Sequence, residues 1–333
     1  MIVNTRSAHC RPPQLAAFAV ILAIVVMLVP AHSLAGSWPE RIVRIITSGG
    51  PGSSVDVAAR MFAERLAERW GQPVVIDSLP GADGILAVQA LLNANDGHSL
   101  LFAFPGVVTV VPLLHERIPY DPIGDLAPIS SGAYDFLTVA VASTLPGSSL
   151  SDLVAFAKTR PGKLNWASPP GAAYLTFLEF QRRAGLTMTY VPYRSPELAL
   201  PDLIAGQIQI AVSPLATALP LVQDGRLKLL AVTTPERAVA APDLPTAIEA
   251  GFPELTVEAP LGFFGPRTMP TELRERIAAD VRLLASDPAI EQRLSALGMV
   301  ARGSTPTEYA AALAEQSAKW AALARTYGVR PRQ

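Results

Sequence analysis

Short β-branched segments alternate with longer amphipathic segments along most of the chain. Residues 41–46 form a short run rich in β-branched residues, which predicts a strand, and residues 53–70 place their apolar side chains at helical spacing. Gly71 follows, where a glycine commonly ends a helix. The same reading predicts further elements in this half of the chain: strands at 73–77 and 100–104 and a helix at 85–93. Strand–helix–strand order with tight turns predicts a parallel sheet with helices on both faces.

A second α/β set follows a turn-rich passage at residues 105–128. It is expected to contain strands at 137–142, 164–167, 187–191, 208–212 and 227–233, and helices at 150–158, 172–184, 197–205 and 216–223. After it come a proline-rich passage and the closing elements, a short strand at 261–264 and helices at 271–285 and 306–326. The closing helices have no sheet of their own, so we expect the chain to return to the first sheet.

That path predicts two α/β domains around a cleft, joined by two hinge crossovers. We expect the first domain to combine residues 36–138 with 257–333, and the second to span 139–256. The hinges are expected near residues 137–142 and 257–264, where the chain changes domain.

The N-terminal residues form a different kind of segment. Residues 1–35 contain two arginines and then an apolar run at 15–29, with small residues at Ser33 and Ala35. This pattern predicts a secretory signal peptide cleaved after Ala35, with a cut before Leu34 as an alternative. A single membrane anchor is the other interpretation, but ~15 apolar residues are short for a bilayer span. We therefore expect export to the periplasm.

Composition narrows the class of partner. Half of the residues are hydrophobic and 17% are charged, which is typical of a globular protein. The formal net charge of −1 gives no basic field for nucleic acid or for an anionic membrane. The single cysteine, Cys10, precedes the apolar run and leaves with the predicted signal peptide. The mature chain is therefore expected to contain no disulfide and no thiolate nucleophile.

The strongest local feature is the glycine-rich turn at residues 47–56, TSGGPGSSVD. Ser53 and Asp56 form an S-x-x-D capping pattern, which predicts that a helix begins there. Amides at the start of a helix lack intrahelical partners and favour a carboxylate or phosphate. An ordinary, well-capped turn is the alternative. The turn has no P-loop lysine, and it lacks the dinucleotide pattern, although Asp77 keeps a nucleotide site as a lesser alternative.

Similar turns follow the other predicted strands, at residues 80–84, 104–106, 168–171 and 213–214. Ligands of open α/β sheets collect at the carboxyl ends of the strands. Together the five turns predict a cleft of the size of a small carboxylate.

Catalytic and metal-binding constellations are missing from the sequence. His98 and His115 stand apart from any nucleophile motif and are interpreted as loop or surface residues. Asp121 and Asp125 are interpreted as structural acids of a turn. No cluster of residues has the spacing of metal ligands. We therefore expect a binding protein, without enzymatic activity, metal or cofactor.

An ordered set of short motifs resembles one family, the substrate-binding proteins of tripartite tricarboxylate transporters (Bordetella uptake gene receptors). The motifs run through the mature chain, among them PGSSVD (51–56), GQPVV (71–75), PGADG (80–84), YDP (120–122), GKL (162–164), VPY (191–193), DGRL (224–227) and EAGFP (249–253). The resemblance implies a type II periplasmic-binding-protein fold that closes on a carboxylate. It also implies delivery to a two-component membrane permease, by a protein expected to be monomeric.

The resemblance also implies which residues contact the ligand. From the first domain and then the second, these are Ser48, Gly52, Ser53, Ser54, Ala82, Asp83, Gly84, Ser168, Ala172, Tyr193 and Ser213.

Four departures from the family pattern bear on the ligand. Ser48, Gly49 and Gly50 replace a stretch with proline and an aromatic residue, which removes one apolar wall. Asp83 replaces a glycine and, if it faces the cleft, disfavours a polyanion such as citrate. Ser213 replaces an aspartate, which argues against an ammonium-bearing ligand. The turn after Ser168 is short, and Tyr174 replaces a histidine. A mono- or dicarboxylate, aromatic acids included, fits best.

Two other functions fit the same fold. A sensor protein would present its bound carboxylate to a membrane kinase through a different partner surface. An exported enzyme on this fold is disfavoured by the missing catalytic groups. The presence of neighbouring permease or sensor genes would separate transport from sensing.

Overall fold

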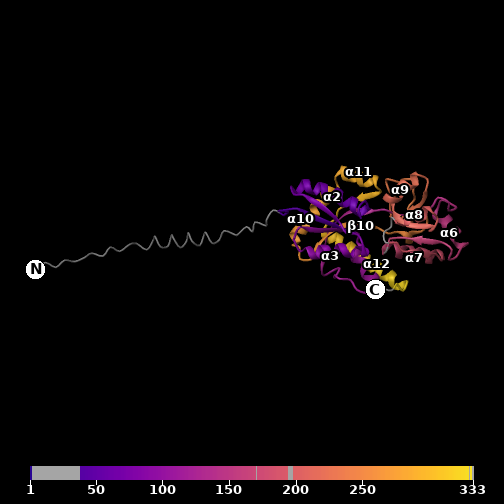
Figure 1. Cartoon of the computed structure of the whole chain (residues 1–333), viewed down its shortest axis with the longest axis horizontal. Helices are drawn as coiled ribbons and strands as arrows, with labels where there is room; N and C mark the ends of the chain where they lie inside the picture. The colour runs from indigo at the N-terminus through magenta and orange to yellow at the C-terminus, as the bar shows by residue number, and fades with distance from the viewer. Residues whose placement is uncertain (2–37, 170, 194–197, 330, 332–333) are drawn as a thin grey trace. The chain divides into compact units, whose positions relative to one another are not determined.

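The computed structural model describes Met1 and residues 38–169, 171–193, 198–329 and 331. The predicted signal peptide at residues 2–35 lies outside the described residues. Residues 41–333 form one compact unit built on two sheets (Figure 1). In the part of the chain that is described, no helix has both the length and the apolar character needed to cross a membrane.

The first sheet has the strand order β11-β4-β10-β3-β1-β2. Its parallel part is β1, β2 and β3, and its antiparallel part is β10, β4 and β11. The bounds are β1 (Val43–Thr47), β2 (Val74–Ser78), β3 (Ser99–Ala103), β4 (Leu126–Asp135), β10 (Ala259–Pro266) and β11 (Met299–Ala301). The predicted parallel pairing of the first three strands is confirmed, whereas the returning strand β10 runs antiparallel to both β3 and β4. β4 and β11 were not predicted as strands.

Helices cover this sheet, and most begin and end where the hydrophobic pattern places them. They are α2 (Ser54–Trp70), α3 (Ile85–Ala94), α10 (Thr271–Ala285), α11 (Pro288–Ala296) and α12 (Pro306–Thr326). α2 follows Ser53 as its N-cap, and Gly71 ends it with a left-handed φ of 64°. α11 was missed by the sequence reading.

The second sheet has the strand order β7-β6-β8-β5-β9, in which β5 runs antiparallel to its neighbours β8 and β9. Its strands are β5 (Leu137–Ala142), β6 (Asn165–Ala167), β7 (Thr189–Tyr190), β8 (Ile210–Pro214) and β9 (Leu227–Val232). The helices are α6 (Leu150–Lys158), α7 (Ala172–Ala184), α8 (Ala199–Ile204) and α9 (Leu215–Gln223). Trp166, Phe177 and Phe180 form the centre of its core.

Two crossovers connect the sheets and lie side by side. The chain leaves the first sheet at Asp135 and enters the second at Leu137. On the return path, the Thr233 amide donates to the Leu137 carbonyl over 2.8 Å, and the Val257 amide donates to the Thr233 carbonyl over 2.9 Å. These bonds hold the outgoing and returning segments together.

α12 forms a third connection between the two sheets. Tyr309 and Leu313 near its start pack into the core that contains Phe264 of the first sheet. Trp320 near its end is buried in the core of the second sheet. Figure 1 shows this helix ending beside α7.

A buried glutamate on α7 holds the chain just after α12. Glu179 accepts hydrogen bonds from Arg182, Arg183 and the hydroxyl of Tyr327. The hydrogen bond from Arg182, which outweighs the opposing effect of burial, and those from Tyr327 and Arg183 lower the pKa of Glu179 from 4.5 to about 2.

We expect Glu179→Gln to destabilise the protein in a pH-dependent way. A depressed pKa contributes stability above the unfolded-state value, and that stability is lost as the pH falls toward the folded-state value. At neutral pH the variant should melt ~2–6 °C below the wild type. The gap should narrow as the pH falls from about 5 toward 3. Differential scanning calorimetry of both proteins, with Glu315→Gln on the exposed face of α12 as control, measures the gap. An unchanging gap would contradict the assignment.

Candidate functional site

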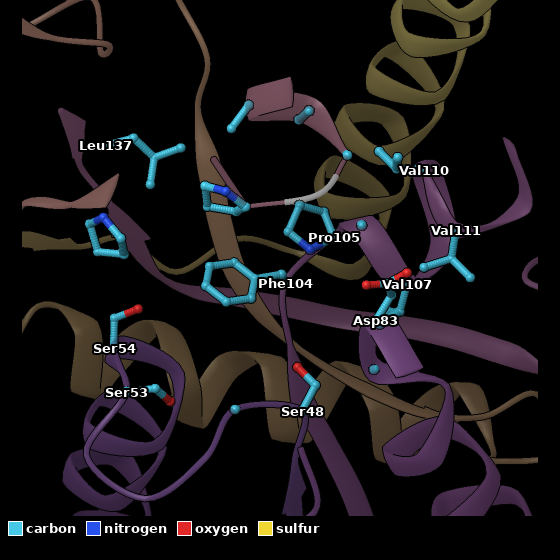
Figure 2. Close-up of a pocket in the computed structure, with 18 of the residues that line it drawn as sticks. Ser48, Ser53, Ser54, Asp83, Phe104, Pro105, Val107, Val110, Val111 and Leu137 are labelled. Atoms are coloured by element: carbon cyan, nitrogen blue, oxygen red, sulfur yellow. The ribbon is translucent and has the colours of Figure 1, made fainter. Parts of the chain in front are cut away.

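A cavity of about 220 Å³ is lined by residues that end or follow strands of both sheets (Figure 2). The first-sheet side contributes the segments after β1, β2 and β3. The second-sheet side contributes the segments at β6 and β8, and both crossovers reach the cavity. The lining residues are Ser48, Gly49, Gly50, Ser53, Ser54, Pro80, Gly81, Asp83, Gly84, Phe104, Pro105, Gly106, Val107, Val110, Val111, Leu114, Leu137, Pro169, Gly171, Ala172, Ala173, Pro214, Val257 and Glu258.

The turn between β1 and α2 is fixed by a buried carboxylate. The side chain of Ser53 accepts a hydrogen bond from the Asp56 amide over 3.3 Å, as the capping pattern predicts. In a complete capping box the Asp56 carboxylate would also accept a hydrogen bond from the Ser53 amide. Here it accepts instead from the Gly52 amide (3.0 Å). Asp56 also accepts from the Ser78 hydroxyl at the end of β2 (2.7 Å), and it pairs with Arg60. The Asp56 side chain thus connects the turn after β1, the end of β2 and the first turns of α2.

These contacts keep Asp56 ionised although it is buried. Burial alone would raise the pKa of Asp56, but the hydrogen bonds from Arg60, Ser78 and the Gly52 amide outweigh it and lower the pKa. The turn therefore holds its shape throughout the neutral range. Ser54 is the first residue of α2, so its N–H has no acceptor within the helix, and Ser54 lines the cavity.

The turn between β2 and α3 has four consecutive residues with positive φ. The values are 125° at Gly81, 47° at Ala82, 55° at Asp83 and 91° at Gly84. The left-handed region is costly for Ala82, whereas aspartate visits it more readily. Gly84 is required for space as well, because a Cβ there would lie 2.7 Å from Cγ1 of Val107. The turn brings Asp83 to the cavity wall.

Asp83 has a partner that the sequence reading missed. Nε2 of His115 lies 2.8 Å from Oδ2 of Asp83, and the two side chains are 19% and 23% exposed. His115 was interpreted as a loop or surface residue, but it follows α5 and contacts the cavity wall from behind. A separation of 32 positions gave no sequence signal for this pair.

An apolar wall closes the cavity on the side of the segment after β3. The passage predicted as turn-rich forms two short helices, α4 (Gly106–Thr109) and α5 (Val111–Leu114). Val110 between them packs in the core of the second sheet, and a Cβ on Gly171 would lie only 2.9 Å from its Cγ1. The signal was present as a run of apolar residues at 107–114, which the proline and glycine before it obscured. This wall supplies apolar surface of the kind that the Ser48 stretch lacks.

The predicted ligand contacts fall into two groups. Those that line the cavity are Ser48, Ser53, Ser54, Asp83, Gly84 and Ala172. Gly52, Ala82, Ser168, Tyr193 and Ser213 are not among the lining residues. Tyr193 donates to Asp202 over 2.5 Å, and Ser213 is 1% exposed beside the lining residue Pro214. A ligand contact by any of the eleven stays a prediction.

Two further expectations concern this region. Tyr174, which replaces a histidine of the family pattern, stacks on Trp166 with ring centroids 5.7 Å apart instead of lining the cavity. No group of three or more metal-ligating side chains occurs among the described residues.

We expect Asp56→Asn to loosen the β1–α2 turn. The change removes the charge that pairs with Arg60 and weakens the bonds to Gly52 and Ser78, at a cost of ~1–3 kcal/mol. Urea denaturation measures it. Glu68→Gln, which removes the acid of an exposed pair with Arg65, should cost less than ~0.5 kcal/mol and is the matched control. Equal losses in the two variants would show that Asp56 has no special role.

Known proteins resemble this chain over nearly its whole length. A UPF0065 protein of Bordetella bronchiseptica is 34% identical over 312 residues, covering 92% of this chain and 92% of the relative. The structure of R. palustris Rpa4515 with adipate aligns with a TM-score of 0.83 at 29% identity, covering 89% of this chain and 100% of that one. MatC from Rhodopseudomonas palustris with bound malate gives 0.76 at 26% identity, covering 86% and 99%.

These structures confirm the predicted periplasmic-binding-protein fold. The first sheet contains both parallel and antiparallel strands. The family described as tripartite tricarboxylate transporter family receptor matches residues 58–329. That match covers most of the chain, including every segment that lines the cavity from Pro80 onward. The chain therefore belongs to the family of tripartite tricarboxylate transporter receptors.

Proposed function

We propose that this protein captures a small carboxylate in the periplasm and delivers it to a two-component membrane permease of the tripartite tricarboxylate type. The observation that carries the proposal is the cavity, which joins the start of α2 and three serines to an apolar wall. Helix-start amides and hydroxyls bind a carboxylate without a basic side chain.

The cavity lining indicates the shape of the ligand. Ser48, Ser53 and Ser54 supply hydroxyl groups to the lining, Asp83 and Glu258 supply carboxylates, and Val107, Val110 and Val111 supply apolar surface. A carboxylate with an apolar body fills such a cavity well. The solved structures with adipate and malate support a small carboxylate as the ligand class.

The two sheets give the receptor a way to respond to its ligand. Residues of both sheets line the cavity, so a bound ligand favours the closed arrangement by its extra contacts. We place the hinges at the paired crossovers, with domain one formed by 36–138 and 257–333 and domain two by 139–256. After export directed by the signal peptide at 1–35, the permease would bind the closed form of the monomer.

Thermal-shift measurements with mono-, di- and tricarboxylates, aromatic acids and acidic amino acids test the proposal. A ligand that binds only the folded protein adds about 2.7 kcal/mol of stability at a hundredfold excess over Kd. We expect a clear shift with one class of acid. In Ala172→Tyr the new ring enters the cavity from the start of α7, and the shift should disappear.

Ala311→Tyr, at an exposed position of α12, is the control and should keep the wild-type shift. If folded protein, stripped of any co-purified ligand, responds to none of these acids, the carboxylate proposal fails. If Ala172→Tyr responds like the control, the ligand binds elsewhere.

A further inference from the structure

The charges that line the cavity are unusual for an anion receptor. Among the described lining residues, Asp83 and Glu258 are acidic and none is a lysine or an arginine. Glu258 is exposed, whereas the side chain of Asp83 is 23% exposed. A carboxylate ligand therefore shares the cavity with a largely enclosed negative charge.

Asp83 lies at the end of the cavity away from α2. Figure 2 shows Ser53 and Ser54 on one side, Asp83 beside Val107 on the other, and Phe104 and Pro105 between them. An elongated ligand whose first carboxylate lies at the start of α2 directs its far end toward Asp83.

The position of Asp83 is fixed from two directions. Its backbone is held in the left-handed region within the run of positive φ at residues 81–84. Its carboxylate is held by His115 at 2.8 Å, from a residue that does not line the cavity. Asp83 therefore cannot easily move aside when a ligand enters.

We propose that Asp83, positioned by His115, makes this receptor selective for monocarboxylates with an uncharged, largely apolar body, and excludes dicarboxylates of the same length. The inference rests on the proposed carboxylate-binding function and narrows it. A second carboxylate placed near Asp83 in a partly enclosed cavity meets a like charge, and the described lining residues include no lysine or arginine to offset it. The apolar wall formed by Val107, Val111 and Leu114 suits an uncharged chain or ring.

Matched acids that differ only at the far end test this selectivity. Hexanoate is compared with adipate, and benzoate with terephthalate, by isothermal titration calorimetry on the purified protein. We expect the wild type to bind the monocarboxylate of each pair at least ~10-fold more tightly.

Asp83→Asn should remove most of this preference. Asparagine is close in shape, tolerates the left-handed region and carries no charge. Dicarboxylate affinity should rise ~10-fold or more relative to the affinity for the matched monocarboxylate. Asp77→Asn removes the same charge at the end of β2, where Asp77 pairs with Arg44 outside the cavity lining. This control should keep the wild-type ratio.

The outcomes separate the two proposals. Equal affinities for the two acids of a pair in the wild type, or an unchanged ratio in Asp83→Asn, would overturn the role of Asp83 while leaving carboxylate binding intact. A parallel loss of ratio in Asp77→Asn would show that net charge, not position, sets the preference. If neither the wild type nor the variants bind any acid of either pair, the proposed function itself fails.

Discussion

The return of the chain to the first sheet is the constraint on which the site depends. β10 follows all strands of the second sheet in the chain, and it lies between β3 and β4 and pairs with both. Phe263 on this strand is buried against Phe102 and Phe62, with ring centroids 4.6 and 5.7 Å apart. Because β10 lies inside the sheet and its aromatic side chains are buried, the returning crossover ends in a well-packed position. The cavity then lies between two sheets whose connecting segments are bonded to each other.

The polar part of the cavity is built from backbone and small side chains, not from basic residues. This requires the turns after β1 and β2 to keep their shape without a ligand. Asp56 does so for the first turn, through bonds to Gly52, Ser78 and Arg60. In the second turn the run of positive φ does the same, at a conformational cost that the surrounding packing must offset. Preorganised turns of this kind need little rearrangement to accept a carboxylate, which favours affinity.

Much of the fold follows from the sequence because its signals are local. The bounds of α6, α7, α10 and α12 agree with the predicted ranges, since the amphipathic spacing that defines each helix lies within its own segment. β4 and β11 were missed because their pairing comes from strands distant in the chain. β4 contains Pro128 and two serines, and its pairing with β10 and β11 makes it a strand.

The residues of the site likewise fall into those that local sequence predicts and those that depend on contacts between distant segments. Ser53, Ser54 and Gly84 belong to turns whose own residues reveal them, and all three line the cavity. The apolar wall had a signal in residues 107–114, but the role of His115 could not be found so, because its contact with Asp83 joins segments 32 positions apart. Asp83 was visible in the sequence as a departure from the family pattern, but its effect on the ligand depended on whether its side chain faces the cavity. A carboxylate that faces solvent is hydrated, whereas one that lines the cavity repels an anionic ligand. Only the fold shows which of these applies to Asp83. The start of α2 is therefore predictable from local residues, whereas the far end of the cavity depends on contacts between segments distant in the chain.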